Sequence, residues 1–513
     1  MNAVSVPGVY VEEQKYALSP LRMDKSCCAG FVGIAERGPL NKLVLVDSFD
    51  AYSGIFGGFD TAGVLPLSVY SFFKCGGSRC AVVRVADEKE ARPARLSLKC
   101  EGGGFIRFTA KSEGAWANHI AARVWHEKGG AAEKRFSLRL SCKKRIETYL
   151  DLSLNPKSGR YYLPFINSRS ALCAVEAENP KGPPRECFAL RAEGGADGIA
   201  DMSAGDFIGW YGGADRCRGI GAFEGRDDID LIAAPDLSWL LLAPGKNHGE
   251  KEENVFSAQA ALVNQARRFP GRFAVLDAPD CCDPCQAAAW ARKFDSASAA
   301  LYYPAVEVLD PLDSGGSKTV RIPPSGAVCG CIAAQEARRG IFYAPANVTL
   351  CGAAAAAYRP TAAEEDFLYS SGVNVLKYFP GRGVKIWGCR TLSSDPAWKY
   401  INVRRTFSRI SRSLKKGTQW AVFEPNTGNL RKRLVRQVSG FLLDLWTSGC
   451  LAGTTPGQAF FVRCDEELNP PENAGKGILT FEAGVAITRP LEFFRIRIIA
   501  EKEGGSVYVE QSL

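Results

Sequence analysis

The sequence predicts a multidomain protein of the α/β and α+β classes, in which a central α/β domain is interrupted by a β-rich insertion. Three observations support this prediction. Apolar strand-like runs and helix-length stretches alternate through residues 191–394, which is typical of a parallel sheet with covered faces. Residues 89–190 instead alternate polar and apolar side chains, as half-buried strands do. Residues 395–500 hold two helical stretches and several strands, which indicates a C-terminal α+β domain.

The first half of the central domain, residues 26–88, reads as strand, loop, helix and strand. The run CCAGFVGIAERGP and the apolar stretch NKLVLVDSF come first, and a glycine-rich FGGF follows them. LPLSVYSFFK then predicts a helix. The aliphatic run at residues 80–85 predicts the strand that completes this half.

The second half of the central domain, residues 191–394, repeats the strand and helix order. Apolar runs predict strands at residues 230–235, 272–277 and 299–308, and SAQAALVNQARRF and QAAAWARKFDSAS predict the helices between them. The insertion that separates the two halves carries a tryptophan turn at residues 114–118. The charged, proline-rich ENPKGPPRE marks the return from the insertion to the central domain.

The two ends of the chain carry nearly the same short strand-forming word, and we expect residues 1–25 and 501–513 to be arms. The β-favouring residues of these words are Val9, Tyr10, Val11 and Glu12 near the start, and Val507, Tyr508, Val509 and Glu510 near the end. A strand this short must add its backbone groups to the edge of a sheet. That sheet belongs either to the same domain or to a neighbouring copy, and the residues alone leave both alternatives open.

The composition indicates a globular protein with a substantial core, since 46% of the 513 residues are hydrophobic. No run of eighteen apolar residues occurs, and the first thirty residues lack the basic-then-apolar order of a secretory signal. We therefore expect folding in the cytoplasm and no direct membrane insertion.

Catalytic and metal-binding motifs are missing from the sequence. It contains neither a phosphate-binding loop nor a G-x-S-x-G nucleophile elbow, and its three histidines are too few for a typical acid–base or metal site. The tightest cysteine cluster, Cys281, Cys282 and Cys285, has no second pair at zinc-ligand spacing. We expect no enzyme activity, no cofactor and no metal, and we interpret the 18 cysteines as small, reduced, buried residues.

The positive charge is concentrated in one late segment. Residues 401–440 hold ten basic residues and one acid, Glu424, so this segment accounts for the whole net charge of +9. On a helical wheel, Lys432, Arg433 and Arg436 lie opposite an apolar face. A basic surface of this kind predicts an acidic partner, although an ordinary solvated helix face remains the alternative.

Short words spread along the whole chain resemble the contractile tail sheath proteins of bacteriophages and of phage-tail-like injection particles. They occur in the order that this family shows. The words are PGVYVEE at 7–13, GFVGIAERGP at 30–39, FGGF at 56–59, GAWAN at 114–118, PPSG at 323–326, GIFYAPAN at 340–347, GVN at 372–374, WGCRT at 387–391, YINVRR at 400–405, FEPN at 423–426, AFFV at 459–462 and RPLEF at 489–493. The chain departs from the family pattern where Cys329 and Cys389 replace alanine, and where Arg431 follows Leu430 in place of tryptophan.

The resemblance implies a structural subunit that stacks as rings around an inner tube and contracts to drive that tube through a target envelope. It implies that terminal arms of neighbouring subunits augment the sheet of the C-terminal domain, and that the insertion faces outward. The implied partners are other copies of this chain, the inner tube protein, the baseplate and a tail terminator or cap protein, with no nucleic acid and no nucleotide. The implied setting is the bacterial cytoplasm during assembly, and later a tail or injection particle.

The resemblance also gives the basic segment a role. Lys432, Arg433 and Arg436 would face the tube, with Arg404, Arg405, Arg409 and Arg412 as a second group. Two alternative functions remain, and each predicts a different experimental result. An α/β enzyme would show hydrolase or nucleotide-binding activity, and a nucleic-acid-binding protein using residues 401–440 would lose affinity steeply as salt rises.

Overall fold

The computed structural model divides the chain into two compact units, residues 1–24 with 406–489 and residues 25–405 with 490–513. The residues that the structure describes are 21–23, 27–126, 135–143, 145–178, 180–210, 212, 217–237, 240, 248–279, 283–313, 315–472, 476–492, 496–502 and 505–511.

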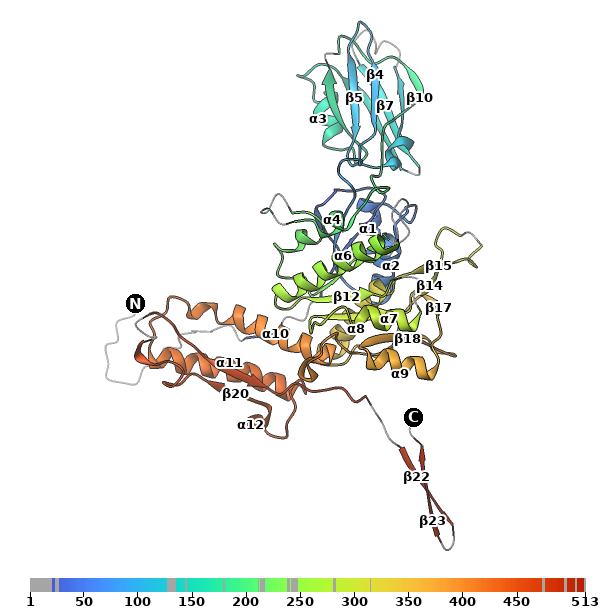
Figure 1. The fold of residues 1–513 in the computed structure, drawn as a ribbon. Coiled ribbons are helices and arrows are strands. Elements are labelled where there is room, and N and C mark those ends of the chain that lie inside the picture. Colours follow the sequence, from blue (N-terminus) through green and yellow to red (C-terminus); the bar gives the residue numbers. More distant parts are fainter. Residues whose placement is uncertain are drawn as a thin grey trace, which may run out of the picture. The chain divides into compact units, whose positions relative to one another are not determined.

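A nine-stranded sheet forms the core of the larger unit (Figure 1), in the order β16-β19-β18-β13-β12-β11-β1-β3-β2. The six strands from β18 to β3 run parallel, and β19, β16 and β2 are antiparallel to their neighbours. Every residue of β1, β3, β12 and β13 is buried, as expected of a sheet covered on both faces. The strands are β1 (Ala29–Gly33), β2 (Leu43–Val46), β3 (Cys80–Arg84), β11 (Leu231–Ala233), β12 (Phe273–Asp277), β13 (Ala299–Tyr303), β16 (Val348–Thr349), β18 (Val373–Phe379) and β19 (Gly383–Trp387).

Two hydrophobic cores lie on the two faces of this sheet. Successive strand residues alternate between them, so Phe31 and Val82 belong to one core while Val32 and Val83 belong to the other. The core of Phe31 is covered by α1 (Phe49–Phe56), α2 (Leu65–Lys74) and α8 (Ser325–Arg339). The opposite core contains side chains from α4 (Ala204–Ile208), α6 (His248–Arg268), α7 (Pro284–Ala291) and α9 (Ala362–Ser370).

Two glycines let α2 and α8 approach very closely. A Cβ atom added at Gly326 would lie 2.4 Å from the carbonyl oxygen of Ser68, and one at Gly330 would lie 2.3 Å from that of Phe72. Larger residues at these positions would push the two helices apart.

The predicted elements of the central domain are present with shifted bounds. The strand predicted at 299–308 is interrupted at Pro304, which has no N–H to donate, and continues as β14 (Val306–Leu309). β14 lies between β15 (Thr319–Ile322) and β17 (Ala353–Ala356) in a separate three-stranded sheet. The helix predicted at 257–269 is the second half of α6, and the helix predicted at 286–298 ends early, at Ala291.

The insertion is β-rich, as predicted, and consists of two antiparallel sheets whose buried side chains form one core from Ala94 to Ala192. One sheet contains β4 (Arg95–Lys99), β5 (Phe105–Ala110) and β9 (Cys173–Glu178). The other contains β10 (Cys187–Arg191), β6 (Ala121–Trp125), β7 (Arg135–Cys142) and β8 (Arg145–Ser153). A short helix, α3 (Tyr162–Asn167), adds Tyr162 and Ile166 to the core.

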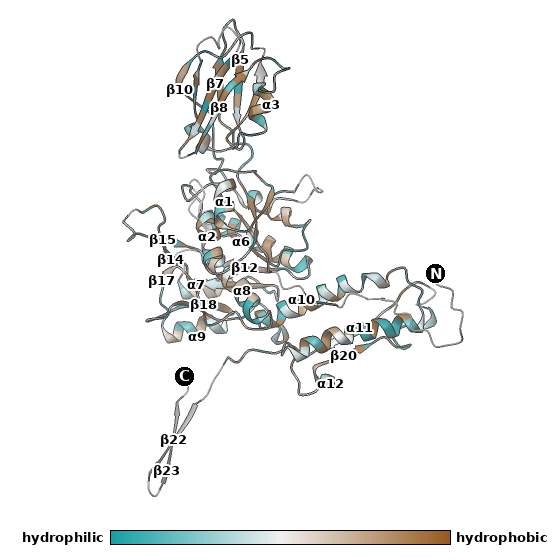
Figure 2. Ribbon diagram, turned by 180° about the vertical axis from the view of Figure 1, so that it is seen from behind, coloured by the Kyte–Doolittle hydropathy of each residue, from teal (hydrophilic) through white to brown (hydrophobic). Residues whose placement is uncertain are grey.

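The smaller unit is built on α11 (Gly428–Thr447), an amphipathic helix with teal and brown stretches in Figure 2. The Thr427 hydroxyl accepts a hydrogen bond of 3.3 Å from the Leu430 N–H and so caps the helix. The predicted apolar face is buried at Leu430, Leu434, Val438, Phe441, Leu442 and Leu445. Other elements of this unit are the larger part of α10 (Ile401–Gly417), α12 (Pro456–Ala459), and the antiparallel pair β20 (Phe460–Arg463) and β21 (Glu482–Val485).

The predicted mixed α/β class is confirmed. A last antiparallel pair, β22 (Ile496–Lys502) and β23 (Gly505–Gln511), belongs to the C-terminal segment of the larger unit. Within the part of the chain that the structure describes, no helix has both the length and the apolar character needed to cross a bilayer.

Candidate functional site

The predicted C-terminal strand is one half of a hairpin. Val507, Tyr508, Val509 and Glu510 lie in β23 and pair with Ala500, Ile499, Ile498 and Arg497 of β22. Among the described strands, β22 and β23 form a sheet of their own, so each keeps one edge with backbone groups that can bond to another sheet. A two-stranded hairpin is marginally stable by itself in water. The N-terminal word Val9 to Glu12 lies outside the described residues.

The chain that leads into this hairpin is fixed at Glu492. Arg390 donates to both carboxylate oxygens, from Nε to Oε1 and from Nη2 to Oε2, at 3.0 Å each. The Tyr369 hydroxyl donates a short hydrogen bond to Oε1, and Lys399 Nζ donates to Oε2 at 3.2 Å. The Glu492 side chain is 6% exposed, so three charged or hydroxyl-bearing residues meet at a carboxylate that water hardly reaches.

These contacts determine the charge state of the cluster. Burial raises the pKa of Glu492, but the hydrogen bonds from Arg390, Tyr369, Tyr400 and Lys399 outweigh it and lower the pKa to about 2. Burial and the hydrogen bond to Glu492 raise the pKa of Tyr400 to about 12. The carboxylate is therefore ionised, and both tyrosines are neutral donors, throughout the physiological range.

A second layer of contacts holds Arg390 in place. The Asn374 side chain, fully buried in β18, accepts from the Arg390 N–H at 2.7 Å and donates to the Arg390 carbonyl at 2.8 Å. The guanidinium lies 3.6 Å from the ring centre of Tyr369 and donates to the Tyr369 carbonyl at 2.9 Å. Cation–π contact and hydrogen bonding together restrict the guanidinium to one orientation.

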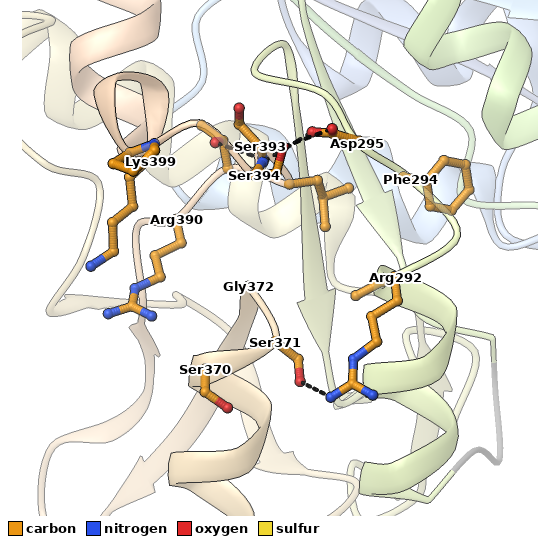
Figure 3. A pocket seen from close by; sticks show the side chains of 14 residues that line it. Arg292, Phe294, Asp295, Ser370, Ser371, Gly372, Arg390, Ser393, Ser394 and Lys399 are labelled. Atoms are coloured by element: carbon orange, nitrogen blue, oxygen red, sulfur yellow. Dashed lines mark hydrogen bonds between the residues drawn. The ribbon is translucent and has the colours of Figure 1, made fainter.

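A cavity of about 560 Å³ opens beside this cluster (Figure 3). Arg390 and Lys399 lie on one side of it, and Arg292 lies on the other, where it donates to the Ser371 hydroxyl at 3.3 Å. Asp295 accepts from the Ser394 N–H at 3.0 Å and from its hydroxyl at 2.8 Å. The lining offers cations and hydroxyl groups, a chemistry suited to carboxylates and water.

The predicted basic group on α10 is corrected by the structure. Arg405, Arg409 and Arg412 are buried, with 6%, 1% and 8% of their surface exposed, and Arg404 is partly buried. Arg405 Nη2 forms a 2.7 Å ion pair with the Glu336 carboxylate in α8, and both side chains are at most 5% exposed. Burial alone would lower the pKa of Arg405, but the charge of Glu336 raises it. The helical wheel could not reveal this burial, because the covering residues are distant in sequence.

The three basic residues predicted on α11 are exposed. Lys432 and Arg436 line a groove of about 500 Å³ together with Arg431, Asp465 and Glu466. Arg433 lies instead 4.7 Å above the ring of Trp420, on another side of the helix. The basic surface therefore separates into the groove pair, Lys432 and Arg436, and a stacked Arg433.

The sixteen cysteines within the described residues are all free thiols, and the described residues contain no cluster of three or more His, Cys, Asp or Glu side chains suited to a metal ion. Cys281 and Cys282, of the cluster noted in the sequence, lie outside the described residues.

Comparison with known proteins identifies the family. Residues 240–392 match the phage tail sheath protein central domain, and residues 393–501 match the phage tail sheath C-terminal domain. The two adjoining matches together cover half of the chain. The chain belongs to the phage tail sheath family.

Curated relatives of this sheath chain carry the same description. The tail sheath protein of Burkholderia phage BcepMu is 25% identical over 534 aligned residues, covering 99% of this chain and 98% of that protein. A putative prophage major tail sheath protein of Pseudomonas aeruginosa is 27% identical over 247 residues, which span 46% of this chain and 58% of that protein.

Solved sheath structures share the fold. The helical sheath of the anti-feeding prophage in its contracted state has a TM-score of 0.58 at 22% identity, covering 97% of this chain and 99% of that chain. The crystal structure of a sheath tail protein from Desulfitobacterium hafniense has a TM-score of 0.60 at 13% identity, covering 99% and 100%.

The Glu492 cluster was not recognised from the sequence. Its members stand in or next to words noted there, WGCRT, YINVRR and RPLEF, but nothing in one sequence pairs Arg390 with a glutamate 102 positions later. One feature of the sequence could have pointed to the cluster. These three words together contain one acidic residue and several residues that form strong hydrogen bonds to carboxylates.

Proposed function

We propose that this chain is the structural subunit of a contractile sheath, which polymerises as stacked rings around an inner tube and contracts to drive the tube through a target envelope. Family membership supports the sheath role. The observation that carries the assembly mechanism is the C-terminal hairpin, whose free edges follow a firmly fixed Glu492.

The proposed link between subunits is addition of the arms to a neighbour's sheet. A strand that adds about four backbone hydrogen bonds contributes roughly 2–6 kcal/mol, because each is worth about 0.5–1.5 kcal/mol net. Such a link is modest by itself, but repetition along a polymer keeps neighbours joined while other contacts rearrange. The N-terminal residues Val9 to Glu12 are proposed as the second arm.

The proposed partners are further copies of this chain, an inner tube protein, the baseplate and a tail terminator or cap protein. We propose that assembly takes place in the bacterial cytoplasm. The basic groove of α11, with Lys432 and Arg436, is the proposed contact with an acidic tube surface.

Electron microscopy and sedimentation of the purified chain, free of nucleic acid, test this function. Full-length protein at high concentration should form tubes or stacked rings, and deletion of residues 496–513 or of 1–14 should leave monomers or short oligomers. Val509→Pro, which removes a backbone N–H from β23, should weaken assembly, whereas the matched Val509→Thr should not.

Three outcomes would contradict the proposal. Full-length protein that stays monomeric and behaves like both deletions excludes strand exchange. Hydrolase or nucleotide-binding activity supports the enzyme alternative. Nucleic-acid binding with a steep salt dependence supports the other alternative.

A further inference from the structure

Three cysteines from separate parts of the sequence meet beside the C-terminal end of α2. Cys75 directly follows that helix, Cys331 lies in α8, and Cys351 lies in the turn between β16 and β17. Cys75 and Cys331 are 7% and 1% exposed, whereas Cys351 is exposed. The close approach of α2 and α8 at Gly330 brings the first two together, since a Cβ there would lie 2.9 Å from Cys75 Cβ.

All three thiols lie at the backbone segment 349–351, to which Cys351 itself belongs. Cys75 Sγ donates to the Cys351 carbonyl at 3.5 Å, and Cys331 Sγ donates to the Thr349 carbonyl, also at 3.5 Å. The Cys75 sulfur also lies close enough to the Cys331 and Cys351 thiols for both of them to affect its pKa. One nearly buried sulfur thus lies between a buried thiol and an exposed one.

The pKa of Cys75 shifts in the opposite direction from that of two other buried cysteines, Cys28 and Cys173. Burial raises the pKa of Cys28 to about 11 and that of Cys173 to about 12, so these thiols are inert. The neighbouring Cys331 thiol lowers the pKa of Cys75 despite its burial, and the contacts with Cys351 and the charge of Lys74 act in the same direction. The thiolate, which is the nucleophile in disulfide chemistry, is therefore favoured at Cys75.

We propose that Cys75, Cys331 and Cys351 form a thiol–disulfide exchange site, which reacts with a small-molecule disulfide such as oxidised glutathione and ends as a Cys75–Cys351 disulfide. The exposed Cys351 is the thiol that a dissolved disulfide reaches. Its thiolate attacks one sulfur of the reagent, forms a mixed disulfide, and releases one thiolate that takes up a proton. Partial burial and the neighbouring Cys75 raise the pKa of Cys351, which lowers the fraction of Cys351 present as thiolate.

The second step closes the disulfide. The Cys75 thiolate attacks Cys351 Sγ, the bond between Cys351 and the reagent breaks, and the second reagent thiolate leaves and is protonated. Two protein thiols are oxidised while one reagent disulfide is reduced to two thiols, so two electrons and two protons pass to the reagent. Cys331 is a positioning residue, because its thiol adjoins the attacking sulfur and lowers the pKa of Cys75.

The product would connect the end of α2 to the turn that follows β16, the strand at one edge of the nine-stranded sheet. Oxidation would therefore fix this edge strand to a helix that covers the sheet. The site is independent of the proposed sheath function, since it depends on the folded larger unit.

Oxidised glutathione added to the native full-length chain, followed by alkylation and peptide mass spectrometry, tests the proposal. The expected product is a peptide pair joined through Cys75 and Cys351, with two thiols lost per chain. Cys75→Ala should stop at a stable glutathione adduct on Cys351, and Cys351→Ser should form neither product. Cys331→Ala should still form the adduct but should close it at least about tenfold more slowly.

Cys285→Ser is the matched control, because Cys285 is exposed in α7, away from the trio, and its loss should leave the Cys75–Cys351 product unchanged. A persistent adduct on Cys351 in the wild-type chain would overturn the proposal. Closure at equal rates in the wild type and in Cys331→Ala would overturn the positioning role. If Cys75→Ala fails to fold, the joined peptide in the wild-type chain decides the question by its presence or absence.

Discussion

Arg390 binds Glu492 through two parallel hydrogen bonds of 3.0 Å, one to each carboxylate oxygen. This bidentate pair connects the third residue after β19 with the segment that runs into the β22–β23 hairpin. If the hairpin joins a neighbouring subunit, force applied to it reaches the folded unit at Glu492. A contact at this position must resist that force. A bidentate guanidinium–carboxylate pair is suited to this role because it is strong and directional.

Glu492→Gln should destabilise the larger unit by on the order of 3 kcal/mol, because it leaves the charges of Arg390 and Lys399 without their carboxylate in a nearly buried site. Thermal and urea unfolding measure this loss. Assembly should fail at a protein concentration at which the wild-type chain polymerises.

Glu467→Gln is the matched control for this substitution. Glu467 also pairs with an arginine, Arg463, at 2.6 Å, but its side chain is 82% exposed. Its replacement should change stability by less than about 0.5 kcal/mol, as is usual for surface ion pairs. Equal effects of the two substitutions would show that the Glu492 cluster is an ordinary surface contact.

Asp236 should make the folded state less stable as pH rises from about 4 to about 7. Burial raises the pKa of this carboxyl from 3.8 to about 7, even though the N–H groups of Ile34 and Val64 donate to it. Between these two pH values the folded state binds more protons than the unfolded state, so the free energy of unfolding falls as pH increases. Above the folded pKa this contribution is lost in full.

Asp236→Asn should therefore flatten the dependence of unfolding free energy on pH between 4 and 7, as measured by urea titrations at several pH values. Asp366→Asn, at an exposed position of α9, serves as the control and should leave that dependence unchanged. An unchanged slope in Asp236→Asn would assign the pH dependence to other groups.

The sequence predicted those features that depend on local pattern. Strand and helix alternation indicated the covered parallel sheet, and the wheel of α11 placed Leu434 and Val438 inward and Lys432 outward. The sequence did not predict features that depend on contacts between residues far apart in the chain. α10 has the same kind of basic pattern, yet Arg405 is buried against Glu336, a residue 69 positions away. A run of charged residues in a helix therefore does not show whether those residues form buried ion pairs or lie on the protein surface.

Arg405→Met should destabilise the larger unit by about 3–5 kcal/mol, since it leaves Glu336 as an uncompensated buried charge. The double variant Arg405→Met with Glu336→Leu should recover much of this loss, because well-packed apolar residues often replace a buried pair at little cost. Chemical denaturation of the two single variants and the double variant measures the coupling. Additive effects would show that the two side chains do not stabilise each other.

The α11 groove should bind the tube through charge. Reversing Lys432 and Arg436 to glutamate should lower the affinity for the cognate tube protein roughly tenfold, since each exposed charge contributes on the order of 1 kcal/mol or less. Binding by the wild-type chain should weaken as ionic strength rises, because salt screens exposed charges beyond about 8–10 Å. Co-sedimentation with assembled tubes at several salt concentrations measures both effects.

Reversal of Lys415 and Lys416, two exposed lysines at the end of α10, changes the net charge by the same amount and serves as the control. If binding depends on the groove, this control retains near wild-type affinity while the groove variant loses both affinity and salt dependence. Equal losses in the two variants would mean that the tube senses total charge and not the groove. No loss in either would remove α11 from the tube contact, and would leave its basic face as a solvated surface.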